Sequence, residues 1–292
     1  MTGGERIAQL EITLSQYGLE RSLAHIWHTS FGGGRRETDL FFRSCWRPEN
    51  GLVLLADGKP AAALYLLPCR ILLPSGPVQA HYLYAAATLP QYRGRGYMGY
   101  LLEAAARYGQ RRGDAVSVLL PGEPSLYEYY HRFGYRTVFG VREWQPEPDT
   151  FFQSLPREKT ILTPRECAEI RSRCLEKQAG SVLWDVRSVQ FALWAQRKWG
   201  QGTVFTKNGY GLFTRKGMVQ ELMALPGEEK ALLLQMQRAV SPHTLTLRLP
   251  VKSPLFPGKG TVCPHGMLRP LCREVVRGFP ADGTPYLGLT ME

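Results

Sequence analysis

The sequence predicts an α/β (α+β) fold with a mixed, largely antiparallel central sheet, and two observations support this. The apolar runs 52–56 and 61–67 flank Asp57-Gly58, and an Asp-Gly pair between apolar runs is a strong hairpin signal. Further along, Gly94 and Gly96 separate a strand-like stretch from a helix-like one. Strands followed by a crossover helix and returning strands are typical of a mixed sheet rather than a purely parallel one.

The elements of the first half follow from the spacing of apolar residues. Met98, Leu101, Leu102 and Ala105 recur at helical spacing, whereas aromatic and small side chains over 78–88 favour a strand. In chain order we expect two helices within Ile7–Phe31, interrupted near Tyr17-Gly18; strands Leu52–Ala56, Ala61–Leu67 and 78–88; a helix Met98–Arg112; a strand Ala115–Leu120; a short helix Pro124–Phe133; and a strand Tyr135–Trp144 that closes the sheet.

The second half repeats this order with weaker signals. A hairpin is expected around Lys207-Asn208-Gly209. The other elements are helices Leu162–Lys177, Ser188–Trp199 and Glu228–Val240, and strands Thr203–Thr206, Gly211–Thr214, Val219–Ala224 and Thr244–Leu249. Leu225-Pro226-Gly227 stands where the first half has Gly94 and Gly96, so the second half lacks the paired-glycine turn.

The chain length and one polar segment predict two domains. A length of 292 residues suits two domains of about 150 residues better than one core. The polar run Gln145–Asp149 contains two prolines, which disfavour helix, so it is the expected linker. We therefore expect domains at residues 1–145 and 146–292.

Charge and cysteine content limit the function classes. The net charge is +11, of which residues 1–150 supply 16 − 14 = +2 and residues 151–292 supply 20 − 11 = +9. This surplus is diffuse, so nucleic-acid binding is not favoured over a solvated basic face or long-range steering of anionic ligands. Six scattered cysteines, at 45, 69, 167, 174, 263 and 272, fit reduced thiols, and their spacing matches no zinc pattern, so we expect no metal.

The chain gives no sign of export or membrane insertion. Its start, Met1-Thr2-Gly3-Gly4-Glu5-Arg6, lacks the basic-then-apolar pattern of a signal peptide, and no apolar run approaches the roughly 18 to 20 residues of a membrane span. We expect a cytoplasmic protein. The sequence leaves its oligomeric state open.

The turn at Gly94 and Gly96 has the chemistry of a pyrophosphate site. A helix N-terminus has unpaired N–H groups and partial positive charge, and glycine lets a diphosphate approach the backbone. A Walker loop is excluded because no Gly-Lys-Ser/Thr follows. Gly99 completes the glycine spacing of a dinucleotide fingerprint, but Asp114 is only a weak acidic match and Pro90 with an antiparallel-looking stretch precedes the turn.

Two motifs resemble the GNAT superfamily of N-acetyltransferases. Gln91-x-x-Gly94-x-Gly96 matches the loop that holds the pyrophosphate of acetyl-coenzyme A in that family, and Tyr130-His131-Arg132-Phe133-Gly134-Tyr135 is similar to its later tyrosine motif. Segments 23–31, 85–98 and 285–292 look like bacterial relatives of the enhanced intracellular survival (Eis) acetyltransferases. Longer members of that group add a sterol-carrier-like third domain, and from the 292 residues we expect only the first two domains here.

The resemblance implies a site as well as a fold. It implies a GNAT domain followed by a degenerate GNAT-like domain that shapes the acceptor site and does not bind coenzyme. By the resemblance, Tyr130 is the general acid for the leaving thiolate. The backbone that binds the thioester carbonyl, pantetheine and pyrophosphate is implied to belong to Ala86, Ala87, Thr88, Arg93, Gly94, Arg95, Gly96, Tyr97, Met98 and Gly99.

The base and the acceptor pocket are less defined. Longer relatives use the carboxylate at the end of the third domain as base. Candidates here are Glu123, Glu128, His81 and the carboxylates of Glu292. Trp27 and Phe31 could line an acceptor pocket, although aromatic residues on an amphipathic helix are more often core.

The sequence therefore predicts an N-acetyltransferase that uses acetyl-coenzyme A as cosubstrate and acetylates a primary amine by direct attack in a ternary complex. The acceptor is a small molecule or a protein lysine or N-terminus. One alternative is a coenzyme A binding sensor or regulatory protein without turnover. A nucleic-acid binding module using the basic second half is the third and weakest.

Overall fold

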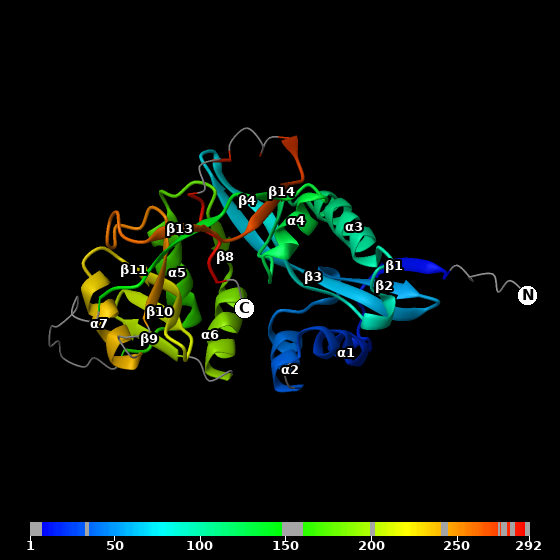
Figure 1. Ribbon diagram of the computed structural model, residues 1–292, viewed down its shortest axis with the longest axis horizontal. Coiled ribbons are helices and arrows are strands. Elements are labelled where there is room, and N and C mark those ends of the chain that lie inside the picture. Colours follow the sequence, from blue (N-terminus) through cyan, green and yellow to red (C-terminus); the bar gives the residue numbers. More distant parts are fainter. Residues whose placement is uncertain are drawn as a thin grey trace, which may run out of the picture.

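Two β-sheets form the centres of two lobes in the computed structural model (Figure 1). The structure describes residues 8–32, 35–147, 160–198, 202–240, 245–273, 275, 279–280 and 284–289. None of the helices in these residues has the length and hydropathy of a membrane span. Each sheet is mixed, with one parallel strand pair in an otherwise antiparallel order.

The first sheet has the strand order β1-β2-β3-β4-β5-β14-β6, and β8 pairs with the outer part of β3. Its strands are β1 (Leu10–Leu14), β2 (Gly51–Ala56), β3 (Lys59–Leu73), β4 (Gly76–Thr88), β5 (Val116–Leu119), β6 (Arg136–Thr137), β8 (Val182–Trp184) and β14 (Met267–Pro270). The expected hairpin at Asp57-Gly58 is confirmed, because β2 and β3 pair antiparallel up to Ala56 and Lys59.

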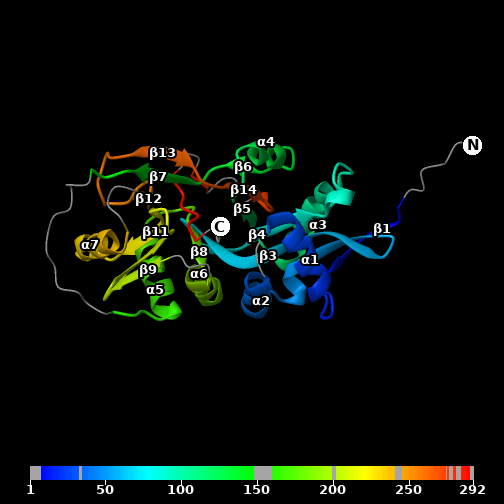
Figure 2. The ribbon, with the colours of Figure 1, turned by 60° about the horizontal axis from the view of Figure 1, so that its bottom comes forward.

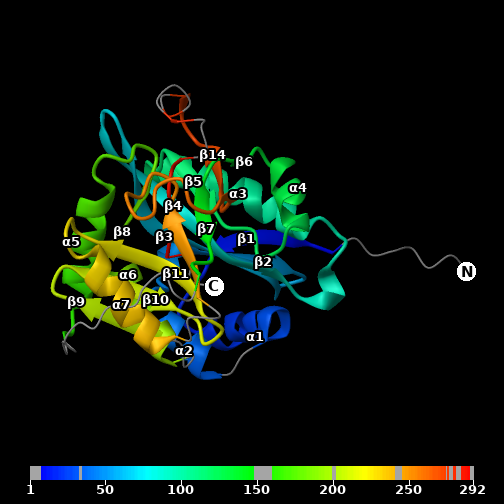
Figure 3. The same ribbon diagram turned by 60° about the vertical axis from the view of Figure 1, so that its left-hand side comes forward.

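Helices cover both faces of this sheet (Figure 3). They are α1 (Glu20–Phe31) and α2 (Arg35–Ser44) on one face, and α3 (Tyr97–Arg112) and α4 (Ser125–His131) on the other, with short 3-10 helices η1 (Pro48–Asn50) and η2 (Pro90–Tyr92). Since both faces are covered, every residue of β2 is buried except Leu55, which is half-buried.

The second sheet has the order β13-β7-β12-β11-β10-β9. Its strands are β7 (Gly140–Trp144), β9 (Gly202–Thr206), β10 (Gly209–Phe213), β11 (Met218–Ala224), β12 (Thr246–Pro250) and β13 (Thr261–Pro264), and helices α5 (Pro164–Leu175), α6 (Val186–Lys198) and α7 (Glu229–Ala239) accompany them. The run β11-α7-β12, with its two strands parallel, repeats β4-α3-β5 of the first sheet. The second half is thus built on the same plan as the first, as expected.

The last strand of each half lies in the other half's sheet (Figure 2). β7 pairs with β12 and β13, and β14 lies between β5 and β6. The expectation that Tyr135–Trp144 closes the first sheet is therefore wrong for β7, and only Arg136–Thr137 stays at that edge. Arg142 stabilises this placement, because its buried guanidinium donates to the carbonyl oxygens of Ser253, Leu255, Phe256 and Lys259.

The boundary between the two sheets therefore does not fall at residue 145 of the sequence. The boundary between residues 1–145 and 146–292 stays a prediction about folding units. Of the expected linker, Pro148 and Asp149 lie outside the described residues.

A second correction concerns the first expected helix. Residues Leu10–Leu14 form β1, which pairs antiparallel with β2, and α1 begins only at Glu20; Ile7 lies outside the described residues. Apolar Leu10, Ile12 and Leu14 alternate with polar residues, which is strand periodicity, and the open edge of β2 offers a partner. Helix α2 and the strands β8, β13 and β14 had no counterpart among the expected elements.

Candidate active site

Strand β4 contains a bulge near its end. Its pairing with β3 shifts register between Ala63 and Tyr65, so that Ala85 and Ala86 together lie opposite one residue of β3. Ala85 has a φ of 47°, a left-handed conformation that is uncommon outside glycine. Two residues opposite one define a β-bulge, which bends the strand and redirects its backbone groups.

β4 also separates from β5 before the bulge. The parallel pairing covers Ala80, His81 and Tyr82, and β5 ends at Leu119, whereas β4 continues to Thr88. Backbone groups of a strand alternate between its two edges, so part of the stretch 83–88 presents amides toward the gap. Buried amides require partners, and a ligand with amide groups can supply them. Ala86, Ala87 and Thr88 all lie in this stretch.

The glycine turn follows directly. Gly94 and Gly96 have φ angles of 75° and 76°, both in the left-handed region that favours glycine. A Cβ built at either position meets nothing within 4 Å, so the space over the turn is open. Gly96 is the N-cap of α3, whose first amides therefore point into that space.

Aromatic and arginine side chains brace the turn. The Arg93 Nε donates to the Thr88 carbonyl oxygen at 3.0 Å, which ties the turn to the end of β4. Arg95 lies over the Tyr92 ring, 5.8 Å from its centroid, and Tyr92 stacks on Tyr97 at 6.1 Å. Both arginines are exposed, so their remaining N–H groups can reach a phosphate.

At Gly99 the requirement for glycine is steric and does not come from a positive φ. A Cβ at this position would lie 3.0 Å from two ring carbons of Phe133, so its role in the free protein is the close approach of α3 to the residues after α4. Tyr97 is buried and Met98 partly buried, so the Tyr97 side chain is not available to a ligand.

Tyr130 lies on α4 and is 8% exposed. Its ring meets those of Tyr129 and Tyr135 edge-on, with centroids 5.5 and 5.7 Å apart. Burial raises the pKa of Tyr130 well above its usual range, so its hydroxyl is protonated at neutral pH. Tyr130 packs in one hydrophobic cluster with Leu83 of β4 and Leu119 of β5.

The structure thus brings together residues that are far apart in the sequence. The cluster around Tyr130 contains Tyr97 as a buried member, and Ala86 and Met98 pack against it. Ala87 packs on the opposite face of the sheet. The tyrosine, the bulge and the beginning of α3 therefore surround the gap between β4 and β5.

The described candidates for the general base differ in how exposed they are to solvent. His81 is fully buried, and its Nδ1 lies 2.7 Å from the Asp114 Oδ2; burial lowers the pKa of His81 despite this contact. Glu123 and Glu128 are exposed at and next to α4. Glu292 lies outside the described residues. Because His81 is fully buried, it is not accessible to an incoming amine, which argues against His81 as the general base.

An aromatic cluster lies on the other face of the sheet beside the bulge. Trp27 of α1 has ring centroids 5.0 Å from Phe41 and 5.5 Å from Tyr84, and Tyr84 directly precedes Ala85. Phe31 is exposed and packs edge-on against Trp27 at 5.7 Å. The sequence indicated Trp27 and Phe31 but gave no sign of Tyr84, which is identified only by the position of the bulge.

Residues 14–138 match the family described as "Acetyltransferase (GNAT) domain", and this range contains the bulge, the glycine turn and Tyr130. Residues 14–138 are a GNAT acetyltransferase domain. The chain thus carries an acyltransferase domain, as expected. No curated protein matches the sequence.

Solved structures agree with the fold over most of the chain. A GCN5-related N-acetyltransferase from Anabaena variabilis is 18% identical with a TM-score of 0.72, and the match covers 90% of this chain and 73% of that one. Another from Kribbella flavida is 17% identical with a TM-score of 0.65, covering 90% and 71%. Eis1 from Mycobacterium abscessus is 17% identical with a TM-score of 0.64, covering 90% and 74%. At these identities the likeness shows the fold, which is a two-domain GNAT-like arrangement.

The GNAT domain is completed by a strand outside its matched range, because β14 pairs with β5. The described residues between β11 and α7 in the second half form no equivalent of the glycine turn. At the start of α7, the Glu229 carboxylate accepts a hydrogen bond from the Gly227 N–H at 2.8 Å. A carboxylate thus lies where the GNAT domain leaves its helix N-terminus open, which opposes a phosphate there.

Proposed function

We propose that the protein is an N-acetyltransferase that moves the acetyl group of acetyl-coenzyme A to a primary amine by direct attack in a ternary complex. The observation that carries this proposal is the convergence of three features at one gap: the β4 bulge, the open left-handed turn at Gly94 and Gly96, and the buried Tyr130. An extended ligand with a diphosphate at one end and amides along its length fits this geometry.

The residues present fit the coenzyme. Amides of the turn and of the first turn of α3 bind the pyrophosphate, with Arg93 and Arg95 adding charge-assisted hydrogen bonds. The edge of β4 at residues 83–88 hydrogen-bonds the pantetheine amides and the thioester carbonyl oxygen, where negative charge develops. When bound, acetyl-coenzyme A supplies an activated acetyl thioester.

Tyr130 holds the proton for the leaving sulfur. Its raised pKa keeps the phenol protonated until needed, but burial also makes the phenolate costly. When Tyr130 gives its proton to the leaving sulfur, its oxygen must therefore receive another proton. The attacking amine has to lose a proton, so it is the source that balances the reaction. Overall, the N–C bond forms, the C–S bond breaks and one proton passes from nitrogen to sulfur.

The decisive measurement is thiol release from acetyl-coenzyme A with purified protein and a panel of polyamines, aminoglycosides and lysine peptides. We expect release that depends on one class of acceptor. Tyr130→Phe should lower kcat by about 10²-fold or more, the usual contribution of a general acid, with coenzyme affinity little changed. Tyr129→Phe is the matched control, because Tyr129 neighbours Tyr130 on α4 and is only partly buried.

Two results would count against parts of this proposal. Equal kcat for Tyr130→Phe and the parent protein would remove Tyr130 as the acid. Coenzyme binding without release for any acceptor would favour a coenzyme A sensor.

A further inference from the structure

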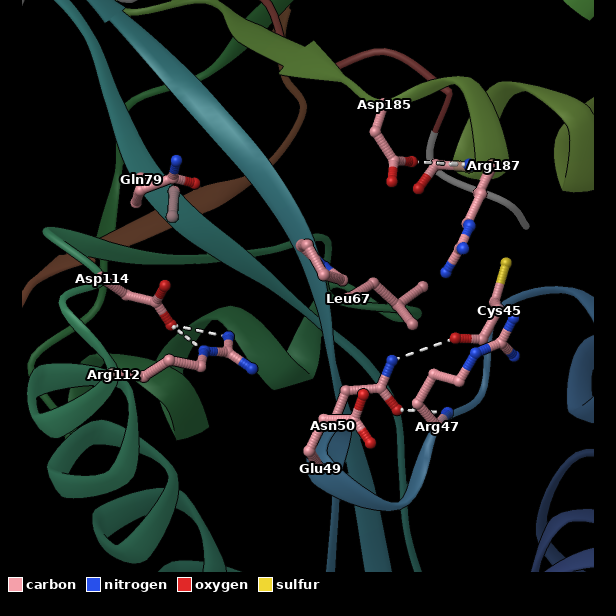
Figure 4. Close-up of a pocket in the computed structure, with 13 residues that line it drawn as sticks. Cys45, Arg47, Glu49, Asn50, Leu67, Gln79, Arg112, Asp114, Asp185 and Arg187 are labelled. Atoms are coloured by element: carbon pink, nitrogen blue, oxygen red, sulfur yellow. Dashed lines mark hydrogen bonds and ion pairs between the residues drawn. The ribbon is translucent and has the colours of Figure 1, made fainter.

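One cavity lies far from the proposed acetyl-transfer gap between β4 and β5. Along the edge of β3, pairing with β2 ends at Tyr65 and pairing with β8 begins at Cys69. A cavity of about 320 Å³ opens at this interruption. It is lined by residues of both halves, among them Cys45, Arg47, Leu67, Asp114, Asp185 and Arg187 (Figure 4).

Its position along β4 separates it from the acetyl-transfer gap. The cavity contacts β4 at Gln79 and Ala80, whereas the bulge is at Ala85 and Ala86. A strand rises about 3.3 Å per residue, so the two places are roughly 20 Å apart. The cavity is therefore not part of the acetyl-transfer gap, and an inference about it does not depend on the proposed function.

Two arginines from opposite halves converge on this cavity. Arg47 precedes η1 and Arg187 lies in the first turn of α6. Figure 4 shows both side chains beside Cys45. Burial, and then the Asp185 carboxylate, raise the pKa of the Cys45 thiol to about 12, while Arg47 and Arg187 act on it in the opposite direction.

Neither guanidinium group has an ion-pair partner among the described residues; Arg187 is exposed and Arg47 is partly buried. The described residues offer the Arg187 guanidinium no hydrogen-bond or ion-pair partner. The Arg47 Nη1 donates to the carbonyl oxygen of its neighbour Trp46.

Three carboxylates also line the cavity, and the described residues show none of them paired with Arg47 or Arg187. Asp114 accepts from Arg112 at 2.6 Å and lies 2.7 Å from the His81 Nδ1. Asp185 accepts from the Ser188 N–H at 2.8 Å at the start of α6, and Glu49 is exposed to solvent. Arg47 and Arg187 therefore remain as a pair of like charges without a carboxylate bound between them.

We propose that this cavity is a second ligand site that takes a small anion, a carboxylate or phosphate group held between Arg47 and Arg187. Guanidinium forks bind such groups through paired charge-assisted hydrogen bonds. The anion would bridge the segment after α2 to the start of α6. These helices already touch through Phe41 and Phe191, with ring centroids 5.9 Å apart, so the ligand would hold the two halves together.

The test is titration calorimetry of the full chain with inorganic phosphate and, separately, with citrate, at constant ionic strength set with sodium chloride. Binding of one probe and not the other would assign the site to phosphates or to carboxylates. We expect Arg187→Gln to weaken binding about tenfold or more, because it removes a charged partner. Arg197→Gln is the matched control, since it makes the same change at an exposed position on the same helix.

A third variant separates this site from the glycine turn, which can also bind phosphate. Arg95→Gln should leave binding at the cavity unchanged. Three results would overturn the proposal: no binding of either probe up to roughly 10 mM, equal binding by the parent protein and Arg187→Gln, or a loss confined to Arg95→Gln.

Discussion

At the scale of single residues, the glycine turn permits a test that separates strain from function. Gly96 and Gly113 lie at opposite ends of α3 with φ angles of 76° and 88°, and an added Cβ at either meets nothing within 4 Å. Alanine at either position should therefore cost about 1 kcal/mol of stability through backbone strain alone. Only Gly96→Ala should also weaken coenzyme A binding, measured by calorimetry. Equal loss of binding in Gly113→Ala would show that the effect is only structural.

A buried histidine makes a second prediction at this scale. Burial, followed by the nearby Arg248, lowers the pKa of His265 from 6.5 to about 4. A folded-state pKa below the unfolded value means that the unfolded chain binds the proton more readily, so stability falls as pH drops below about 6.5. His265→Gln should remove about 2.5 kcal/mol of this loss between pH 7 and 4.5.

The measurement is urea unfolding at several pH values. His131→Gln, at an exposed histidine, is the control. If His265→Gln and the parent protein lose stability in parallel down to pH 4.5, His265 is not the group that titrates.

At the scale of elements, α3 packs on the sheet through a glycine. A Cβ at Gly109 would lie 2.6 Å from the His81 Cε1 and 3.0 Å from the Leu271 Cδ1. Alanine would add about 1 kcal/mol of helix propensity, but overpacking a rigid core costs about 1 to 3 kcal/mol. We therefore expect Gly109→Ala to destabilise the protein.

A double-mutant cycle with His81→Ala tests the cause. Removing the imidazole should reduce or reverse the cost of Gly109→Ala in urea unfolding. Additive effects of the two substitutions would mean that His81 is not what excludes the Cβ.

The elements also show how far the sequence could predict the structure. Local signals were sufficient for the hairpin at Asp57-Gly58 and for α3, because a turn dipeptide and helical spacing are properties of neighbouring residues. The prediction of a helix at β1 is wrong because Leu10 and Leu14, four residues apart, also fit one helix face, whereas Ile12 between them fits only a strand. The placement of β7 and β14 depends on partners more than 100 residues away, and no local pattern encodes that choice.

The candidate site likewise combines features that local motifs predict with features that depend on distant strands. The turn at Gly94 and Gly96 and the position of Tyr130 were readable as motifs. The left-handed Ala85 was not, because alanine carries no signal for positive φ, and the bulge arises from the register between β3 and β4. The cavity at Arg47 and Arg187 could not be predicted from the sequence, because the two arginines belong to different halves and come together only in the folded structure.

At the scale of the whole molecule, the exchange of strands predicts that the halves depend on each other. Without β14, β5 and β6 of the first sheet are not joined. A fragment of residues 1–145 should therefore lack cooperative thermal unfolding by circular dichroism. Adding the fragment 146–292 should restore it. Cooperative unfolding of the first fragment alone would instead support an independent domain ending at residue 145.

The position of β14 late in the chain also has a consequence for synthesis. β5 ends at residue 119, and its neighbour in the sheet begins at residue 267. At about 5 to 20 residues per second, a growing chain waits roughly 7 to 30 seconds between making the two strands. During that time the edge of β5 has no strand to cover it, and an open edge can pair with other chains. Slower translation of this gene should therefore increase aggregation during expression, before any folded enzyme exists.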